Sequence, residues 1–117
     1  RHPTLRQPRD RRIRFSGSWS VRLRSGGHHS NHVHPLGWIS SALYVALPPK
    51  DPAEPEDAGW LTLGKPDELL GIDLAPSRKI EPKAGHLALF PSGMWHGTVP
   101  FNEGERLTVA FDVAPPR

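Results

Sequence analysis

Cysteine is absent from this chain of 117 residues, which excludes disulfide bonds, thiolate metal sites and a cysteine nucleophile. No apolar run approaches the roughly 20 residues that a membrane-spanning helix needs, and no secretory signal opens the chain. These absences predict a cytoplasmic protein without a membrane segment. The first residue is an arginine instead of a methionine, so we expect the chain to be a piece of a longer protein.

The excess of positive charge lies at the start of the chain. The whole sequence has a net charge of +3, but residues 1–14 contain six arginines and one acid, so the rest is slightly negative. A basic segment can attract nucleic acid, yet this one lacks the interleaved aromatic side chains that stack on bases, which argues against a nucleic-acid partner. We interpret residues 1–12 as a basic leader or linker and residues 13–117 as one folded domain.

Short alternating segments separated by turns predict an all-β domain. Residues 13–23 alternate apolar and polar side chains, which is typical of a half-buried strand with one apolar face. Ser25-Gly26-Gly27 then predicts a turn, residues 48–58 a proline-rich surface loop and residues 65–74 one helical turn. Further strands are predicted at residues 32–34, 38–47, 60–63, 78–81, 86–90, 94–99 and 106–113. About eight short strands without a long helix favour a sandwich or a jelly roll.

The last predicted strand has two different faces. Residues 102–105 predict a hairpin turn just before it. One face is apolar and needs a cover if the other face looks into a barrel, so we expect either a preceding N-terminal region or a homodimer to cover it. The faces consist of Arg106, Thr108, Ala110 and Asp112 on one side and of Leu107, Val109, Phe111 and Val113 on the other. We expect Asp112 to pair with a basic group inside.

Histidine is concentrated in one short segment, since four of the seven histidines lie in residues 28–34. On a strand, His32 and His34 would point to the same face about 7 Å apart. Two imidazoles so placed can converge on one metal ion, and imidazole suits iron, copper, zinc and nickel. A pair of solvent-facing histidines is the alternative. We do not expect His28, His29 or His86 to be ligands.

His96 and Arg106 follow on two later strands. An arginine within an apolar strand needs an anionic partner, because an unpaired buried charge is costly, and its planar guanidinium matches a carboxylate. The alternatives are a core histidine with satisfied hydrogen bonds and an edge-strand arginine that reaches solvent. The tryptophans are interpreted first as core or rim aromatics, and a role of Trp38 and Trp95 in shaping a substrate pocket beside the metal is the alternative.

Together these segments resemble the iron(II)/2-oxoglutarate-dependent oxygenases, in particular the small bacterial and phage members of the prolyl-hydroxylase-like group. The resemblance covers residues 13–113. It implies a double-stranded β-helix, a cupin-like jelly-roll barrel, that uses O2 and 2-oxoglutarate to hydroxylate a primary substrate that the sequence does not identify. The segments that carry it are His32-Val33-His34-Pro35, residues 39–45, residues 85–92, Trp95-His96 and Arg106.

The resemblance also implies roles for individual residues. Iron(II) would be bound by His32, His34 and His96. The far carboxylate of 2-oxoglutarate would be bound by Arg106 and Tyr44, helped by Thr98 or Ser40.

The chain departs from the family at one position. The usual pattern is His-x-Asp or His-x-Glu, and His34 takes the place of the acid, so a triad of two histidines and one carboxylate becomes three histidines. Two alternatives to the oxygenase are a cupin-like three-histidine metalloprotein that does not use 2-oxoglutarate and a non-catalytic β-sandwich binding module.

Overall fold

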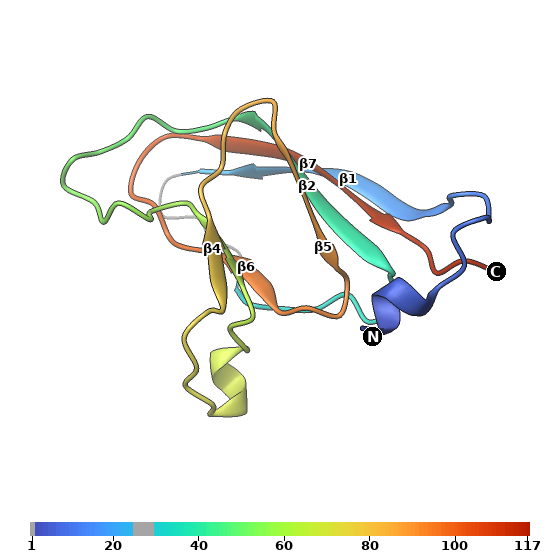
Figure 1. The fold of residues 1–117 in the computed structure, drawn as a ribbon. Coiled ribbons are helices and arrows are strands. Elements are labelled where there is room, and N and C mark those ends of the chain that lie inside the picture. Colours follow the sequence, from blue (N-terminus) through green and yellow to red (C-terminus); the bar gives the residue numbers. More distant parts are fainter. Residues whose placement is uncertain (1, 25–29) are drawn as a thin grey trace.

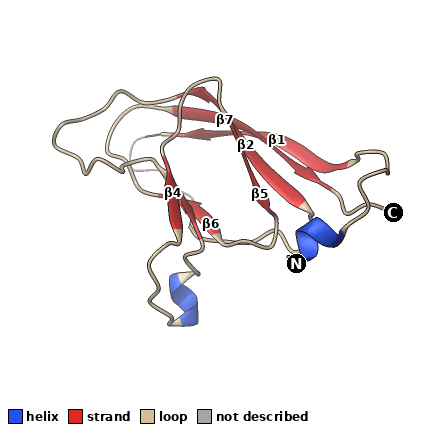
Figure 2. Ribbon diagram, in the orientation of Figure 1, coloured by secondary structure: helices blue, strands red, loops and turns tan. Residues whose placement is uncertain are grey.

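The computed structural model describes residues 2–24 and 30–117 (Figure 1). Seven strands and two short 3-10 helices make up its regular structure, and Figure 2 shows how small the helical part is. The all-β prediction is therefore confirmed. The elements are η1 (Pro3–Arg6), β1 (Phe15–Leu23), β2 (Ile39–Ala46), β3 (Leu61–Leu63), η2 (Glu68–Leu70), β4 (Arg78–Ile80), β5 (Leu87–Pro91), β6 (His96–Thr98) and β7 (Arg106–Val113).

The strands form two antiparallel sheets. The larger has the order β1-β7-β2-β5 and the smaller the order β4-β3-β6. Strands β6 and β7 follow each other in the chain but lie in different sheets, so the prediction of a hairpin turn at residues 102–105 is wrong. The turn carries the chain from the small sheet to the large one, because β7 pairs with β1 and β2 while β6 pairs with β3.

The histidine segment is not a strand, which reduces the count from about eight to seven. His32 forms a single bridge with His96, in which each backbone N–H donates to the other's carbonyl at 2.9 Å. Pairing then stops, because Pro35 has no N–H to donate and Gly37 donates back to the carbonyl of His34. The turn predicted at Ser25-Gly26-Gly27 lies outside the described residues.

Strand β1 contains a bulge that the alternating pattern does not reveal. Its pairing with β7 shifts between Phe15 and Gly17, and the extra residue reverses the faces on either side of the shift. Phe15 accordingly packs on the outer side of the large sheet, with its ring 5.1 Å from that of Phe111, whereas Trp19 faces inward beside His34. The prediction of one apolar face along residues 13–23 is therefore wrong.

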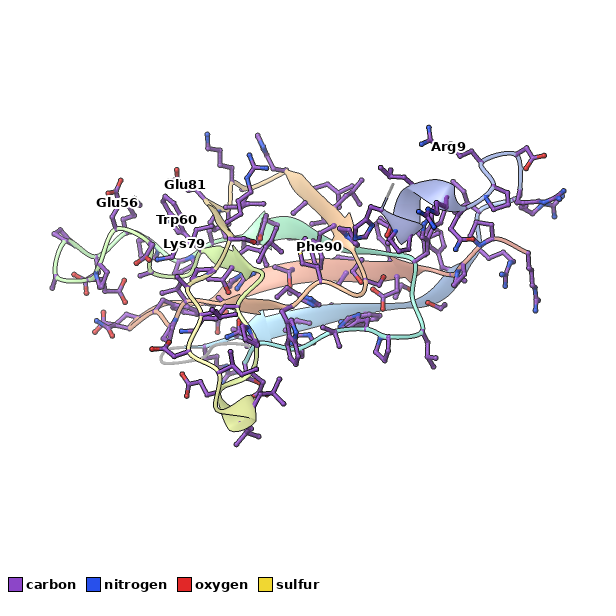
Figure 3. All side chains as sticks on the ribbon, turned by 60° about the horizontal axis from the view of Figure 1, so that its bottom comes forward. Arg9, Glu56, Trp60, Lys79, Glu81 and Phe90 are labelled. Atoms are coloured by element: carbon purple, nitrogen blue, oxygen red, sulfur yellow. The ribbon has the colours of Figure 1, made fainter. Side chains whose placement is uncertain are left out.

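The core lies between the two sheets. Leu61 and Leu63 of β3 meet Phe90 of β5, with Ile80 and Met94 packed around them. Figure 3 places Phe90 in the middle of the molecule. Many of the other buried side chains are polar, and a buried polar group is more informative than a buried apolar one. The buried polar side chains include Ser40, Ser41, Thr62, Ser92, His96, Thr98, Arg106, Thr108 and Asp112.

The N-terminal segment is attached to the domain by two hydrogen bonds. The indole N–H of Trp38 donates to the carbonyl of Thr4 at 2.8 Å, and Arg14 donates to the carbonyl of Pro115 at 2.8 Å. Residues 65–74 contain one helical turn as predicted, capped by the side chain of Asp67 and by Gly71 at φ 68°. Neither helix of the described residues is long and apolar enough to cross a membrane.

Candidate metal centre

Three histidine rings converge on the inner side of the sheets. The ring centroids of His32 and His96 lie 4.2 Å apart, and that of His34 lies 5.1 Å from His32 and 4.9 Å from His96. One nitrogen of each ring lies within 4.8 Å of the corresponding nitrogens of the other two. The backbone bridge between His32 and His96 brings the rings together although residues 32–34 form no strand. The structure thus assembles the three predicted metal ligands.

The second ring nitrogens determine which atoms face the centre. Nδ1 of His32 lies 2.7 Å from a backbone carbonyl oxygen, Nδ1 of His96 lies 3.0 Å from another, and Nδ1 of His34 lies 2.6 Å from Oδ2 of Asp112. A neutral imidazole with hydrogen on Nδ1 carries its lone pair on Nε2. Hydrogen bonds of this kind fix the tautomer of histidine ligands in metal sites, so Nε2 of each ring would be the atom available to a metal ion.

Burial keeps His96 neutral. The pKa of His96 is lowered from 6.5 to about 4, chiefly by burial; the Met94 carbonyl and the Asp112 carboxylate oppose this shift, and the neighbouring rings of His32 and His34 add to it. A neutral imidazole is the form that binds a metal ion. His96 is therefore in the form that could bind a metal ion at neutral pH.

The buried guanidinium of Arg106 lies near the three histidines and lines the same cavity as they do. Arg106 is 5% exposed and donates from Nη1 to Oγ1 of Thr98 at 2.7 Å, with its guanidinium carbon 5.2 Å from the ring centre of Tyr44. Burial lowers the pKa of the Arg106 guanidinium and raises the pKa of the Tyr44 hydroxyl. Each of these two groups opposes the pKa shift of the other, so they interact with one another, but across the described residues neither Nε of Arg106 nor the Tyr44 hydroxyl has a hydrogen-bond partner in good geometry. Two buried polar groups therefore lack the acceptor or donor that burial normally requires.

One cavity of about 80 Å³ connects the histidines with Arg106. Its other lining residues include Trp19, Ser40, Phe90 and Thr98. It provides a place where a metal ion and a small anion could lie next to each other.

Trp19, and neither Trp38 nor Trp95, lines this cavity. Trp19 lines the cavity with its ring 5.9 Å from that of His34, whereas Trp38 lines a groove on the outer side and Trp95 a separate pocket beside Thr4. Trp38 lies just before β2, where its indole turns to the carbonyl of Thr4. The alternative pocket role of Trp38 and Trp95 is therefore not borne out at this cavity. Trp19 lines it instead, and its inward parity with Val21 was the signal that could have identified it.

Two further polar residues support the histidines. Asp112 pairs with His34, which confirms the expectation of a basic partner inside. The hydroxyl of Ser40 lies 3.5 Å from Nδ1 of His34 and donates to the hydroxyl of Ser92. Ser92 is fully buried, and its residue type and position in the sequence did not predict a role in the site. His86 is exposed and outside the histidine group, while His28 and His29 lie outside the described residues.

Comparison with known proteins places these residues in a family context. A sequence model of the family described as "Putative 2OG-Fe(II) oxygenase" matches residues 17–112. A search of curated proteins finds no match.

Solved structures resemble the whole domain. An oxidoreductase of the 2OG-Fe(II) oxygenase family from Burkholderia pseudomallei superposes with a TM-score of 0.65 at 11% identity, over 87% of this chain and 43% of that one. A prolyl-4-hydroxylase from Pseudomonas putida gives 0.60 at 22% identity, over 86% and 52%. HygX from Streptomyces hygroscopicus, with nickel and 2-oxoglutarate bound, gives 0.59 at 14% identity, over 95% and 61%.

These likenesses establish the fold. The two antiparallel sheets form the double-stranded β-helix that the sequence resemblance implies. The chain spans 43–61% of the length of the three structures it is compared with.

Proposed function

The chain belongs to the 2OG-Fe(II) oxygenase family, and from this premise we propose that it is a non-haem iron(II)- and 2-oxoglutarate-dependent dioxygenase that hydroxylates a primary substrate. His32, His34 and His96 bind iron(II), and Arg106 with Tyr44 binds the far carboxylate of 2-oxoglutarate. The observation that carries this proposal is the buried guanidinium of Arg106, which lines the cavity that the three imidazoles share and forms no ion pair with any acid of the described residues.

The donor set fits iron(II). Three neutral imidazoles suit iron, copper, zinc or nickel, and three protein ligands leave coordination positions open for a co-substrate and O2. The burial of His96 supports the neutral ligand form. When bound, the metal and 2-oxoglutarate supply the oxidising chemistry, and the protein supplies orientation and the exclusion of water.

The arginine pocket fits a carboxylate. The buried guanidinium forms no ion pair with any acid of the described residues, so its charge is compensated only by Thr98 and the ring of Tyr44. A carboxylate would accept from Nε of Arg106 and from the Tyr44 hydroxyl. Thr98 keeps the guanidinium in place by accepting from Nη1. Ser40, whose hydroxyl donates to Ser92, lines the same cavity beside His34.

The cupin-like alternative without 2-oxoglutarate accounts for the histidines but leaves Arg106 without an anion. A non-catalytic sandwich accounts for neither. The predicted cytoplasmic location and the predicted lack of a nucleic-acid partner stay predictions.

The test is anaerobic addition of iron(II) and 2-oxoglutarate to the purified chain. We expect a weak visible charge-transfer band that needs both additions. Arg106→Ala should weaken 2-oxoglutarate binding by at least about thirtyfold, as expected for loss of one member of a buried charge pair, while iron(II) binding remains. Arg22→Ala, which removes a surface arginine paired with Glu105, is the matched control and should bind 2-oxoglutarate normally.

Two results would contradict the proposal. Metal binding without the band would favour the cupin-like alternative. Unchanged 2-oxoglutarate binding in Arg106→Ala would remove the carboxylate site assigned to this residue.

A further inference from the structure

His34 differs from the other two histidines in the group that holds its ring. Nδ1 of His32 and of His96 faces a neutral backbone carbonyl, whereas Nδ1 of His34 lies 2.6 Å from a carboxylate oxygen of Asp112. Hydrogen bonds to a charged acceptor are shorter and about twice as strong as those between neutral groups. One ligand of the three is therefore held by a stronger and anionic partner.

Asp112 is fixed in place by three strands. It lies on β7, opposite Ser40 of β2 and opposite Gly17 at the bulge of β1. Its backbone carbonyl accepts from the hydroxyl of Ser16 at 3.3 Å, and its side chain is only 13% exposed. The carboxylate thus lies against Nδ1 of His34 and leaves Nε2 of that ring available to a metal ion.

No lysine or arginine of the described residues forms an ion pair with the carboxylate of Asp112. Within residues 2–24 and 30–117, its one ion-pair contact is the imidazole of His34. A buried carboxylate without a cation is costly, and an imidazole coordinated to a metal ion is a partner that offsets this cost. The burial of Asp112 is therefore best explained by a positive charge on the far side of the His34 ring.

We infer that Asp112 is a positioning residue that holds His34 with Nε2 toward the metal and supplies, through the ring, the negative charge that a carboxylate ligand supplies in a triad of two histidines and one acid. The inference rests on the proposed function, since it assumes a metal ion between the three histidines. It explains how a site with three neutral ligands retains an anion, one hydrogen bond away from the metal. A carboxylate in this position increases the donor strength of the imidazole.

The test is a titration with Co(II), without 2-oxoglutarate, that measures the metal dissociation constant of the purified chain. Asp112→Asn preserves the shape but removes the charge, and we expect it to weaken Co(II) binding by about ten- to a hundredfold, the usual effect of losing such a partner. Asp73→Asn removes an exposed acid elsewhere and should leave the affinity unchanged. The melting temperature of each metal-free variant shows whether the loss is one of folding instead.

A double-mutant cycle separates positioning from other roles. Because Asp112 acts through the ring, Asp112→Asn should have no further effect on Co(II) affinity in a His34→Ala background. An equal loss in both backgrounds would show that Asp112 acts on the metal directly, and unchanged affinity in Asp112→Asn alone would show that it does not act at all. Either result overturns the inference while the proposed function stands, whereas absence of Co(II) binding by the unmodified chain overturns both.

A measurement on the unmodified protein keeps the inference testable if Asp112→Asn does not fold. The metal-free protein should show, in long-range proton–nitrogen NMR spectra, a His34 ring with its hydrogen on Nδ1. A His34 ring with its hydrogen on Nε2 would overturn the inference.

Discussion

At the scale of single residues, the hydroxyl of Tyr44 has opposite effects on stability and on binding. Tyr44 is 2% exposed, and across the described part of the chain its hydroxyl lies near Arg106 without forming a hydrogen bond of good geometry. A buried unpaired hydroxyl destabilises the free protein by roughly 1–3 kcal/mol. The same hydroxyl becomes favourable when a carboxylate accepts from it, so the residue is tuned for the ligand-bound state.

Tyr44→Phe should therefore stabilise the ligand-free chain by about 1 kcal/mol and weaken 2-oxoglutarate binding by about ten- to a hundredfold, the value of a hydrogen bond to a charged group. Urea unfolding measures the first effect and titration of the visible band the second. Phe101→Tyr, which adds a hydroxyl to a ring that is 2% exposed and does not line the cavity, is the control and should only destabilise. Loss of stability in Tyr44→Phe would mean that the hydroxyl has a partner.

At the scale of elements, the turn before β7 determines where Arg106 enters the cavity. Gly104 has φ +96°, and a Cβ there would lie 2.7 Å from Cβ and 3.2 Å from Cα of Pro48. The backbone N–H of Asn102 donates to the side chain of Glu54 in the same proline-rich loop. The turn is thus locked against residues 48–58, and the position of β7 depends on that contact.

Gly104→Ala should destabilise the chain by about 2 kcal/mol or more, because a positive φ costs about 1–2 kcal/mol in a residue with Cβ and the overlap with Pro48 adds to it. Two controls separate the causes. Gly71→Ala has φ +68° with nothing within 4 Å of the new Cβ, so it should show only the backbone cost. Gly93→Ala has neither feature and should be nearly neutral. Urea unfolding that ranks Gly104→Ala no lower than Gly71→Ala would contradict the locked turn.

The elements also show how far the sequence can predict the site. The alternation of apolar and polar residues locates β7 at its observed bounds and on its correct faces, because period two is a local property of a strand. The bulge in β1 and the isolated bridge between His32 and His96 depend on partners far away in the sequence, so no local pattern reveals them. The grouping of His32, His34 and His96 was nevertheless predictable from the family resemblance, and their role as metal ligands stays a prediction. The partner of His34 required the register that places Asp112 opposite Ser40.

At the scale of the whole molecule, the basic and acidic segments lie at opposite ends, and the two faces of the large sheet differ in polarity. Figure 3 shows Arg9 of the basic segment and Glu56 of the proline-rich loop (residues 48–58) at opposite ends of the elongated domain, which measures 48 × 33 × 20 Å. The inner face of the large sheet carries the cavity, while its outer face exposes apolar side chains. These are Phe15 at 63%, Val45 at 47%, Leu87 at 46%, Leu89 at 59% and Val109 at 37% exposure.

This outer face should drive self-association of the chain. Strand β5 is an edge of the large sheet, and an exposed apolar edge strand pairs readily with another copy. We expect sedimentation velocity to show concentration-dependent dimers. Replacement of Leu87 and Leu89 together by lysine should yield a monomer, because charges on an edge strand oppose pairing. Leu69→Lys, at a residue 93% exposed on η2, adds a charge away from this face and should leave the dimer intact. A chain that stays monomeric at all concentrations with its outer face bare would show that a second copy does not cover it.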